Sequence, residues 1–439
     1  MSEINFDGLI GPTHNYSGLS EGNNASKKNC SSPSNPKDAA LQGIKKAEIL
    51  IACGLEQGFF LPHERPFIPG LKKLGFSGTD AEILSSAFNH SKVLLSNFSS
   101  ASSMWAANAA TISPSPDTLD NKIHLTPANL NTMFHRSIET EFTYQQCKII
   151  FPKEYFEIHN PAVTISGYGD EGAANHLRIS KSHNEKGFEI FVYGESGFKT
   201  AKKSVKRQAL EVSRSIAFNH KLDMKNTFFL QQNHKAVEEG SFHNDIVSLS
   251  NENVFIAHEK AFQNKDDLNE MLNVLESKID NFQYIEISNS EIPLKDIINS
   301  YLLNSQLITN GDNEMQLILP EEVKGYENCL SWLDKLKQIS DVKLFDFVDI
   351  RQSMMNGGGP ACLRLKVILN DEELDNLNQN FLMNNERLKS IKLLIEREYR
   401  DELYPDDLKD PKLLDESRRV LDELTQIFGT GSIYEFQKL

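Results

Sequence analysis

The sequence contains few cysteines, no long apolar run and no surplus of positive charge. Its five cysteines are spread over 439 residues, and no two of them have the CxxC spacing of a zinc or redox motif. This pattern argues against a disulfide framework and against a zinc ribbon. No segment approaches the roughly 18 consecutive apolar residues that a membrane-spanning helix needs. We therefore expect a protein with reduced thiols and no membrane partner.

The charge balance and the first residues narrow the class further. Lysine and arginine total 46 against 61 aspartate and glutamate residues, which gives a net charge of −15. A nucleic-acid surface needs a basic patch to neutralise phosphates, so we expect no nucleic-acid partner. The start from Met1 to Asp7 has neither the basic region nor the apolar centre of a signal peptide. These features predict a cytoplasmic globular protein.

Helix and strand signals alternate along the chain, which predicts an α/β fold. Asn35 followed by Pro36 is an N-cap and first-turn pair, and Gly54 is placed to end the helix that they begin. A second helix is expected after Asp80. Its inner face should carry Ala81, Leu84, Ala87 and Leu94.

Strand signals follow, and one pair of them predicts a hairpin. Residues 245–250 and 254–257 are separated by a three-residue polar turn, which favours antiparallel pairing. Such pairing argues against a simple doubly wound parallel sheet. Further short strands are expected at residues 188–193, 282–287, 315–319, 342–347 and 362–368, and residues 371–428 are charged and helical in pattern.

Two polar, glycine-rich segments are candidates for a ligand site. Residues 13–26 combine glycines with many hydrogen-bonding side chains, as a loop that covers a ligand does, although a solvated surface loop has the same composition. Residues 356–362 contain three successive glycines, which allow the backbone to approach a ligand closely. No Lys-Ser/Thr pair follows, so the segment is not a phosphate-binding P-loop. Cys362 at its end is either a nucleophile or a small buried apolar residue.

Histidines and carboxylates in three other turns could also carry chemistry. His243 could act as a general base, could bind a metal together with Asp245, or could belong to a hydrogen-bonded turn. Glu171 and its neighbour Asp170 could hold a cation or cap a helix that begins at Ala173. His135-Arg136 could bind a carboxylate, whereas His63-Glu64-Arg65 is more typical of a structural ion pair. A Cys, a His and a Glu in such turns suit cysteine nucleophilic catalysis.

Several of these blocks resemble the N-succinylarginine dihydrolase family. They are residues 5–16, 62–69, 104–111, 169–176, 242–245 and 356–362, which keep the family's order over nearly the whole chain. The resemblance implies a single pentein domain over residues 1–439, an α/β propeller of five ββαβ units with pseudo-fivefold symmetry. It also implies a homodimer with no metal and no organic cofactor. The implied reaction converts N2-succinyl-L-arginine and two waters to N2-succinyl-L-ornithine, two ammonia and carbon dioxide.

The resemblance also implies roles for particular residues. Cys362 would be the nucleophile, and His243 and Glu171 would complete the catalytic group. The substrate would be bound by the loop Ser17, Gly18, Leu19, Ser20, Glu21, Gly22, Asn23, Asn24, Ala25 and Ser26, and by Asn108, His135, Arg136, Arg207, Asp245 and Asn356. Arg214 and Lys206 are the alternatives to Arg207. We expect the loop to close over the substrate.

Three other functions compete with this one. A guanidine-modifying relative, such as an arginine or agmatine deiminase, would release one ammonia per turnover. A metal-dependent amidohydrolase would use His243 and Asp245. A solute-binding or scaffold protein on a similar frame would not need an intact set of Cys, His and Glu.

Overall fold

The protein is built from five small sheets of one design, as a computed structural model of residues 1–30, 32–196 and 207–438 shows. Each sheet has three strands, and its middle strand runs antiparallel to one neighbour and parallel to the other. The parallel pair requires a crossover, which a helix supplies in every unit. Each unit is therefore a ββαβ motif.

Four units follow one another in the chain. Each comprises a hairpin, a helix and a third strand: β3 (Ala110–Ser113), β4 (Ile123–Pro127), α7 (Thr140–Ile150) and β5 (Phe156–Ile158); β6 (His176–Ile179), β7 (Phe188–Tyr193), α8 (Leu210–Asn219) and β8 (Thr227–Gln231); β9 (Ser248–Asn251), β10 (Val254–His258), α10 (Lys265–Lys278) and β11 (Gln283–Ile287); β12 (Gln306–Thr309), β13 (Met315–Pro320), α12 (Glu327–Ile339) and β14 (Val342–Val348).

The fifth unit joins the two ends of the chain. Its first strand, β15 (Arg364–Leu369), pairs antiparallel with β1 (Ser2–Gly8), and α2 (Pro36–Ala52) then leads to β2 (Glu56–Phe60). The register pairs Ser2 with Leu369 and Asp7 with Arg364. The N-terminal strand thereby closes a ring of five units.

A cavity of about 140 Å³ marks the axis of this ring. Its lining comes from the first strand of each unit or from residues next to that strand: Ile112, His176, Ser248, Ser305 and Lys366 are one example from each unit. Five first strands that share one cavity are the geometry of a propeller. The expected pentein fold is therefore confirmed.

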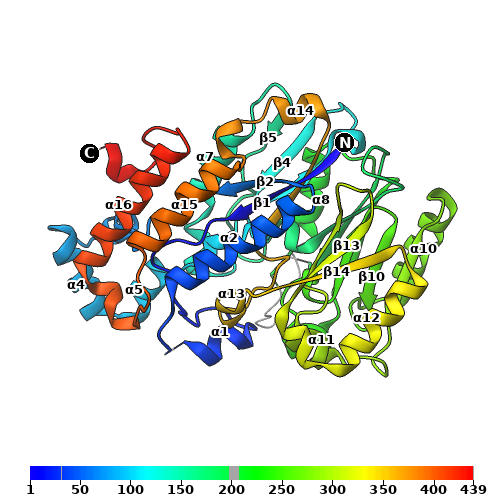
Figure 1. The fold of residues 1–439 in the computed structure, drawn as a ribbon, viewed down its shortest axis with the longest axis horizontal. Coiled ribbons are helices and arrows are strands. Elements are labelled where there is room, and N and C mark those ends of the chain that lie inside the picture. The colour runs from blue at the N-terminus through cyan, green and yellow to red at the C-terminus, as the bar shows by residue number, and fades with distance from the viewer. Residues whose placement is uncertain (31, 197–206, 439) are drawn as a thin grey trace.

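The remaining helices surround the ring. The long C-terminal helix α15 (Asn385–Glu398) lies between α2 and α16 (Pro411–Ile427), on the side of the molecule away from β10, β13 and β14 (Figure 1). The shorter helices are α1 (Asn24–Asn29), α3 (Ile68–Lys73), α4 (Asp80–His90), α5 (Lys92–Phe98), α6 (Phe134–Ser137), α9 (His234–Glu239), α11 (Leu294–Ser300), α13 (Arg351–Met355) and α14 (Asp371–Asp375). No helix within the described ranges combines the length and the apolar composition needed to cross a membrane.

Nine 3-10 turns among the described residues connect these elements, and several of them carry site residues. They are η1 (Ser102–Met104), η2 (Ala106–Asn108), η3 (Ser115–Asp117), η4 (Gly172–Asn175), η5 (Asn244–Ile246), η6 (Glu321–Gly325), η7 (Gln379–Phe381), η8 (Pro405–Lys409) and η9 (Glu435–Lys438).

The local sequence signals predicted some elements correctly and others not. Helix α2 has Asn35 as its N-cap, as expected, because the Asn35 side chain accepts a hydrogen bond from the Asp38 N–H. The hairpin of β9 and β10 is confirmed, but it begins at Ser248, because residues 244–246 form η5. The helix expected from Ala173 is the single turn η4, which leads directly into β6.

The helix expected after Asp80 was predicted too long. It ends at His90, and Leu94 belongs to the separate helix α5. The cause is Ser91, whose extended backbone ends α4 and whose hydroxyl caps α5 by accepting from the Leu94 N–H at 3.2 Å. Ala81 is exposed, and Ile83 takes the inward position in its place.

Candidate active site

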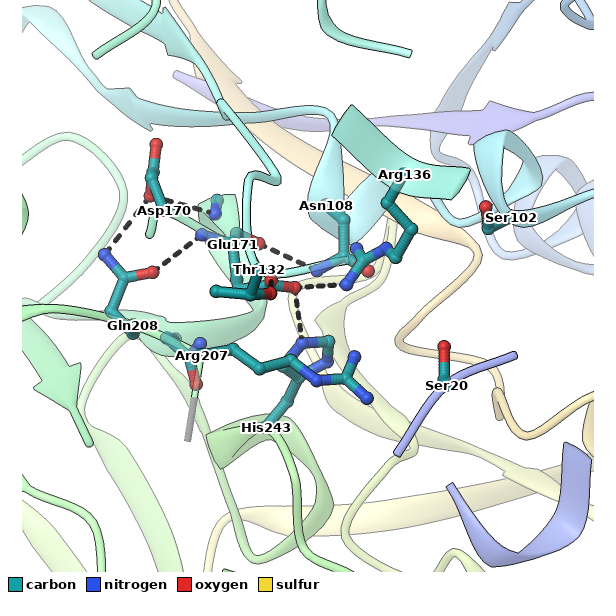
Figure 2. Close-up of polar contacts among 12 residues, drawn as sticks. Ser20, Ser102, Asn108, Thr132, Arg136, Asp170, Glu171, Arg207, Gln208 and His243 are labelled. Carbon is teal, nitrogen blue, oxygen red and sulfur yellow. Dashed lines mark hydrogen bonds and ion pairs between the residues drawn. The ribbon is translucent and has the colours of Figure 1, made fainter. Parts of the chain in front are cut away.

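A fully buried carboxylate, Glu171, is the centre of the polar network shown in Figure 2. Its Oε2 accepts from an Nη1 of Arg136, on α6, and from Nε2 of His243 at 2.8 Å. Its Oε1 accepts from the Thr132 hydroxyl at 2.9 Å. Because a carboxylate can only accept, Nε2 of His243 carries the proton and Nδ1 is left as the basic nitrogen.

The charges in this network have defined states at neutral pH. Burial opposes ionisation of Glu171, but Arg136 and the hydrogen bond from His243 together hold the pKa of Glu171 below its ordinary value. Burial lowers the pKa of His243 to about 4, although Glu171 acts in the opposite direction. Near pH 7 the network is therefore an arginine cation, a carboxylate anion and a neutral imidazole.

The nucleophile candidate, Cys362, lies in a turn just before β15. It is 4% exposed, and its Sγ–H donates to Oδ2 of Asp245 at 3.4 Å. Burial raises the pKa of Asp245 to about 7. Burial and the neighbouring Asp245 carboxylate raise the pKa of the Cys362 thiol well above its ordinary value. The sulfur is therefore a neutral thiol near pH 7.

Two short turns join Cys362 to the Glu171 network. Turn η2 binds both backbones: the Ala107 N–H donates to the Cys362 carbonyl at 3.1 Å, and the Asn108 amide donates to the Glu171 carbonyl at 2.7 Å. Turn η5 begins after His243 and contains Asp245. Cys362, His243 and Glu171, which are far apart in the sequence, are thus connected through η2 and through Asp245, two residues after His243.

The loop of residues 17–26 lies over this constellation, with some residues exposed and some buried. The Ser20 hydroxyl is 3.3 Å from Nε2 of His135, and the backbone carbonyl of Glu21 accepts from Arg207 at 2.9 Å. Ser20, Asn23 and Ser26 are buried, whereas Glu21 and Asn24 are exposed. A solvated surface loop would not bury these polar side chains.

The end of the loop is attached to residues 356–362, the nucleophile turn, which ends at Cys362. Asn23 caps α1 through the Ser26 N–H, and its amide donates to the Asn356 carbonyl at 3.2 Å. The Ser26 hydroxyl donates to Oδ1 of Asn356 at 3.2 Å. Asn356 is thereby held against α1, six residues before Cys362.

Two buried guanidinium groups, those of Arg136 and Arg207, face this loop. Arg207 stacks over Phe242 at 4.6 Å and extends beside His243 toward Ser20 (Figure 2). Nε and Nη2 of Arg136, and Nε of Arg207, have no hydrogen-bond partner in the part of the chain that the structure describes. Burial lowers the pKa of Arg207 only to about 10, so it stays cationic. These free donors suit an anionic ligand.

Arg214 and Lys206 were the alternatives to Arg207 as a substrate-binding residue. Arg214 lies on α8 with its guanidinium 5.7 Å from the Phe229 ring, whereas Arg207 lies beside His243 in Figure 2. Lys206 lies outside the described residues. His135 contacts the loop as a neutral side chain, because burial, Arg136 and Arg207 lower its pKa to about 3.

The structure adds residues that the sequence did not single out. Asn304 connects the nucleophile turn to Asp245: its Oδ1 accepts from the Gly359 N–H at 2.9 Å, and its Nδ2 donates to the Asp245 carbonyl at 3.1 Å. Thr132 and Gln208 position Glu171, by its carboxylate and by its N–H respectively. None of the three lies in one of the motifs described above. Only the folded chain brings them to the site, so the sequence offered no signal for them.

Metal binding by His243 and Asp245 finds no support in the geometry. Within the described ranges, no group of three or more His, Cys, Asp and Glu side chains is arranged to hold a metal ion. His243 contacts Glu171, and Asp245 contacts Cys362. Glu64 forms an ion pair at 2.8 Å with Arg418, which lies outside the His63-Glu64-Arg65 segment.

The ring of five ββαβ units with a Cys, His and acid constellation defines a protein of the pentein class. The solved structures of similar fold include an apo arginine dihydrolase, ArgZ, of the cyanobacterial ornithine–ammonia cycle, with a TM-score of 0.52 and 14% identity over 84% of this chain and 42% of that one. A ternary complex of AgrE with ornithine and NAD+ has a TM-score of 0.51 and 12% identity over 84% of this chain and 40% of that one. At such identities the likeness concerns the fold.

Sequence comparison identifies the family. The family model of succinylarginine dihydrolase matches residues 1–437. The N-succinylarginine dihydrolase of Idiomarina loihiensis is 45% identical over 445 residues, which is 99% of both chains. That of Aliivibrio fischeri is 47% identical over 442 residues, again 99% of both. The chain belongs to the succinylarginine dihydrolase family.

Proposed function

We propose that this protein hydrolyses N2-succinyl-L-arginine with two waters to N2-succinyl-L-ornithine, two ammonia and carbon dioxide, as a step of arginine catabolism. The observation that carries the proposal is a buried Cys362–Asp245 pair joined to a buried Arg136–Glu171–His243 chain. Attack on a guanidinium carbon needs a thiol as the nucleophile, an imidazole as the base and carboxylates that hold the guanidinium, and these groups are present here. Family membership supplies the substrate.

The two ends of the substrate match the two sides of the site. Its guanidinium is a planar cation whose N–H groups need acceptors, and the buried Oδ1 of Asp245 has no partner within the described part of the chain. Its succinyl and α-carboxylates need donors, which Arg136 and Arg207 offer. The loop of residues 17–26, with Asn108, His135 and Asn356, surrounds the chain between these ends.

The first round converts the guanidinium to a ureido group. The sulfur of Cys362 bonds to the guanidinium carbon, while the thiol proton passes to Nδ1 of His243. His243 returns this proton to a nitrogen, which leaves as ammonia. Water then bonds to the same carbon and gives one proton to His243, and the carbon–sulfur bond breaks. His243 returns this proton to Cys362, the second water proton passes to solvent as the carbon–oxygen double bond forms, and neutral bound N2-succinylcitrulline remains.

The second round repeats these steps on the ureido group. The sulfur bonds to the ureido carbon, ammonia leaves, and water releases the product from sulfur as a carbamate. The carbamate separates into carbon dioxide and the amine of N2-succinyl-L-ornithine. The balance is two waters consumed and two ammonia released, whereas a deiminase would stop after the first round.

The test is a count of ammonia per substrate consumed. We expect two ammonia per succinylarginine for the wild type, and activity reduced at least 10³-fold for Cys362→Ser, as order-of-magnitude losses for a removed nucleophile indicate. Cys53→Ser is the matched control, because this half-buried thiol caps the end of α2 and lines a different cavity. One ammonia with accumulated succinylcitrulline would favour the deiminase, and full activity of Cys362→Ser would refute cysteine catalysis.

We also propose that residues 1–439 form one catalytic domain that acts as a homodimer in the cytoplasm, on a small-molecule substrate alone. Cys53, Cys147, Cys329 and Cys362 are free thiols, which suits a reducing compartment. The closure of β15 on β1 makes the two ends of the chain parts of one sheet, which suits a single domain. Light scattering would give about twice the 49.6 kDa chain mass for the dimer and the chain mass itself for a monomer.

A further inference from the structure

One buried donor next to the nucleophile has no assigned role. The Trp105 side chain is 8% exposed, and its indole N–H has no acceptor in the part of the chain that the structure describes. A buried unpaired donor loses its hydrogen bonds to water without compensation, so proteins rarely keep one without a use. Such a donor beside a reacting atom is a candidate for a contact that forms only when the ligand is bound.

The indole nitrogen and Cys362 both lie against Gly358. A Cβ built on Gly358 would lie 3.0 Å from Nε1 of Trp105 and 3.1 Å from the Cβ of Cys362. The absence of a side chain at residue 358 therefore leaves the indole N–H directly beside the nucleophile turn. The backbone of the same segment is fixed as well, because the Asn108 N–H donates to the Trp105 carbonyl at 3.0 Å.

The two rounds of the proposed reaction need different groups around the reacting carbon. The guanidinium is a cation with N–H groups only, and carboxylates such as Asp245 suit it. The ureido group is neutral and has an oxygen, and this oxygen becomes negative when sulfur adds to its carbon. Carboxylates repel that charge, so the second round needs a donor that the first does not.

We propose that the indole N–H of Trp105 donates to the ureido oxygen as it gains charge, and that this contact enables the second hydrolysis. The inference rests on the proposed function. In this step the carbon–sulfur bond forms, the π electrons of the carbon–oxygen double bond move to oxygen, and they return when ammonia leaves. Trp105 thereby decides whether one ammonia or two are released.

The test compares Trp105→Phe with the wild type and with Trp332→Phe. The chain has only two tryptophans, and Trp332 is 3% exposed on α12, in a different hydrophobic cluster, so it is a matched control. Loss of one oxyanion donor typically lowers kcat by about 10²–10³-fold. We expect Trp105→Phe to slow succinylcitrulline hydrolysis by that factor, to change succinylarginine consumption only a few-fold, and to release one ammonia instead of two.

The outcomes separate this inference from the proposed function. If the wild type itself does not release two ammonia, the proposed function fails. If the wild type releases two and Trp105→Phe also releases two, or loses both rounds by equal factors, the role of Trp105 is refuted while the proposed function stands.

A second measurement avoids dependence on the folding of Trp105→Phe. In a Cys362→Ser protein labelled with [15N]tryptophan, the two indole N–H signals are assigned with Trp332→Phe. Addition of N2-succinylcitrulline should move the Trp105 indole proton downfield, as a new hydrogen bond does, and leave the Trp332 signal in place. A Trp105 signal that does not move at saturating ligand would overturn the inference.

Discussion

The proposed nucleophile, Cys362, is a protonated thiol that is hydrogen-bonded to Asp245. Burial and Asp245 both raise the pKa of Cys362, and His243 stays neutral because burial lowers its pKa to about 4. A bound guanidinium would change this balance, because its positive charge favours both the Asp245 carboxylate and the thiolate. In the proposed reaction the substrate itself thus activates the sulfur, and a neutral alkylating reagent does not.

Alkylation of Cys362 by neutral iodoacetamide tests this arrangement. Below about pH 7, Asp245 is protonated and does not oppose the thiolate; above that pH its charge holds the thiol pKa up. Asp245→Asn removes the charge at every pH, so its Cys362 should react faster than the wild type, with a difference that widens above pH 7. A thiol pKa lowered by one unit means about ten times more thiolate. Mass spectrometry of the Cys362 peptide from pH 6 to 10 gives the rates.

Asp170→Asn is the control for this experiment. Asp170 is also fully buried, and burial raises its pKa to about 6, but it bonds to Gln208 and to the Gly172 N–H rather than to the thiol. This variant should keep the wild-type alkylation profile. Equal rates for Asp245→Asn and the wild type would contradict the role given to Asp245.

At the scale of elements, the site depends on short turns that hold one another. Gly357 follows α13 and its C-cap Asn356, and its φ of +100° is unfavourable for any residue with a side chain. A Cβ there would lie 2.1 Å from the side chain of Asn23, which caps α1 and bonds to Asn356. This glycine lets the covering loop and the nucleophile turn approach each other.

Gly357→Ala should therefore separate these two turns. Left-handed backbone costs a residue with a Cβ about 1–2 kcal/mol, and the displaced Asn23 loses its hydrogen bonds. We expect a lower free energy of unfolding, a KM for succinylarginine raised at least about tenfold because 1.4 kcal/mol of lost binding has that effect, and faster tryptic cleavage at the exposed Lys27 and Lys28.

Gly325→Ala provides the matched comparison. Nothing lies within 4 Å of a Cβ at this glycine, which has no left-handed φ. The free energy of unfolding of Gly325→Ala should stay within about 0.5 kcal/mol of the wild type, and its KM should be unchanged. If Gly357→Ala behaves like Gly325→Ala, the close approach to Asn23 does not hold the loop.

Local signals in the sequence predicted those elements whose cause is local. The N-cap Asn35 fixes the start of α2, and three glycines together marked the nucleophile turn. Leu94 was misplaced because its apolar spacing continues past Ser91, where the cap interrupts the helix. Asn304 and Thr132 could not be found, because each contacts the site through residues more than 35 positions away. The catalytic group came from whole motifs that resemble a family, not from spacing.

At the scale of the whole molecule, the position of the nucleophile depends on closure of the ring. Cys362 lies just before β15, which pairs with the N-terminal strand β1 over six residue pairs. Asp7 of β1 and Lys46 of α2 form an ion pair of 2.5 Å, and both side chains are almost completely buried. This pair connects β1 to α2 inside the closing unit, so its loss should weaken the closure itself.

Lys46→Met should destabilise the protein by about 3–5 kcal/mol, the usual cost of leaving one partner of a buried pair unpaired. Asp7→Asn combined with Lys46→Met should recover most of that loss, because no charge then stays buried.

The stability lost in Lys46→Met depends on pH. Burial already raises the pKa of Asp7, and without Lys46 this pKa rises further. The variant is therefore closest to the wild type at pH 5, and it loses stability as rising pH ionises the unpaired Asp7. Urea unfolding at pH 5 and pH 8 measures this, with the neighbouring, largely exposed Lys45→Met as control. A Lys46→Met protein as stable as Lys45→Met at pH 8 would show that the buried pair does not support the ring.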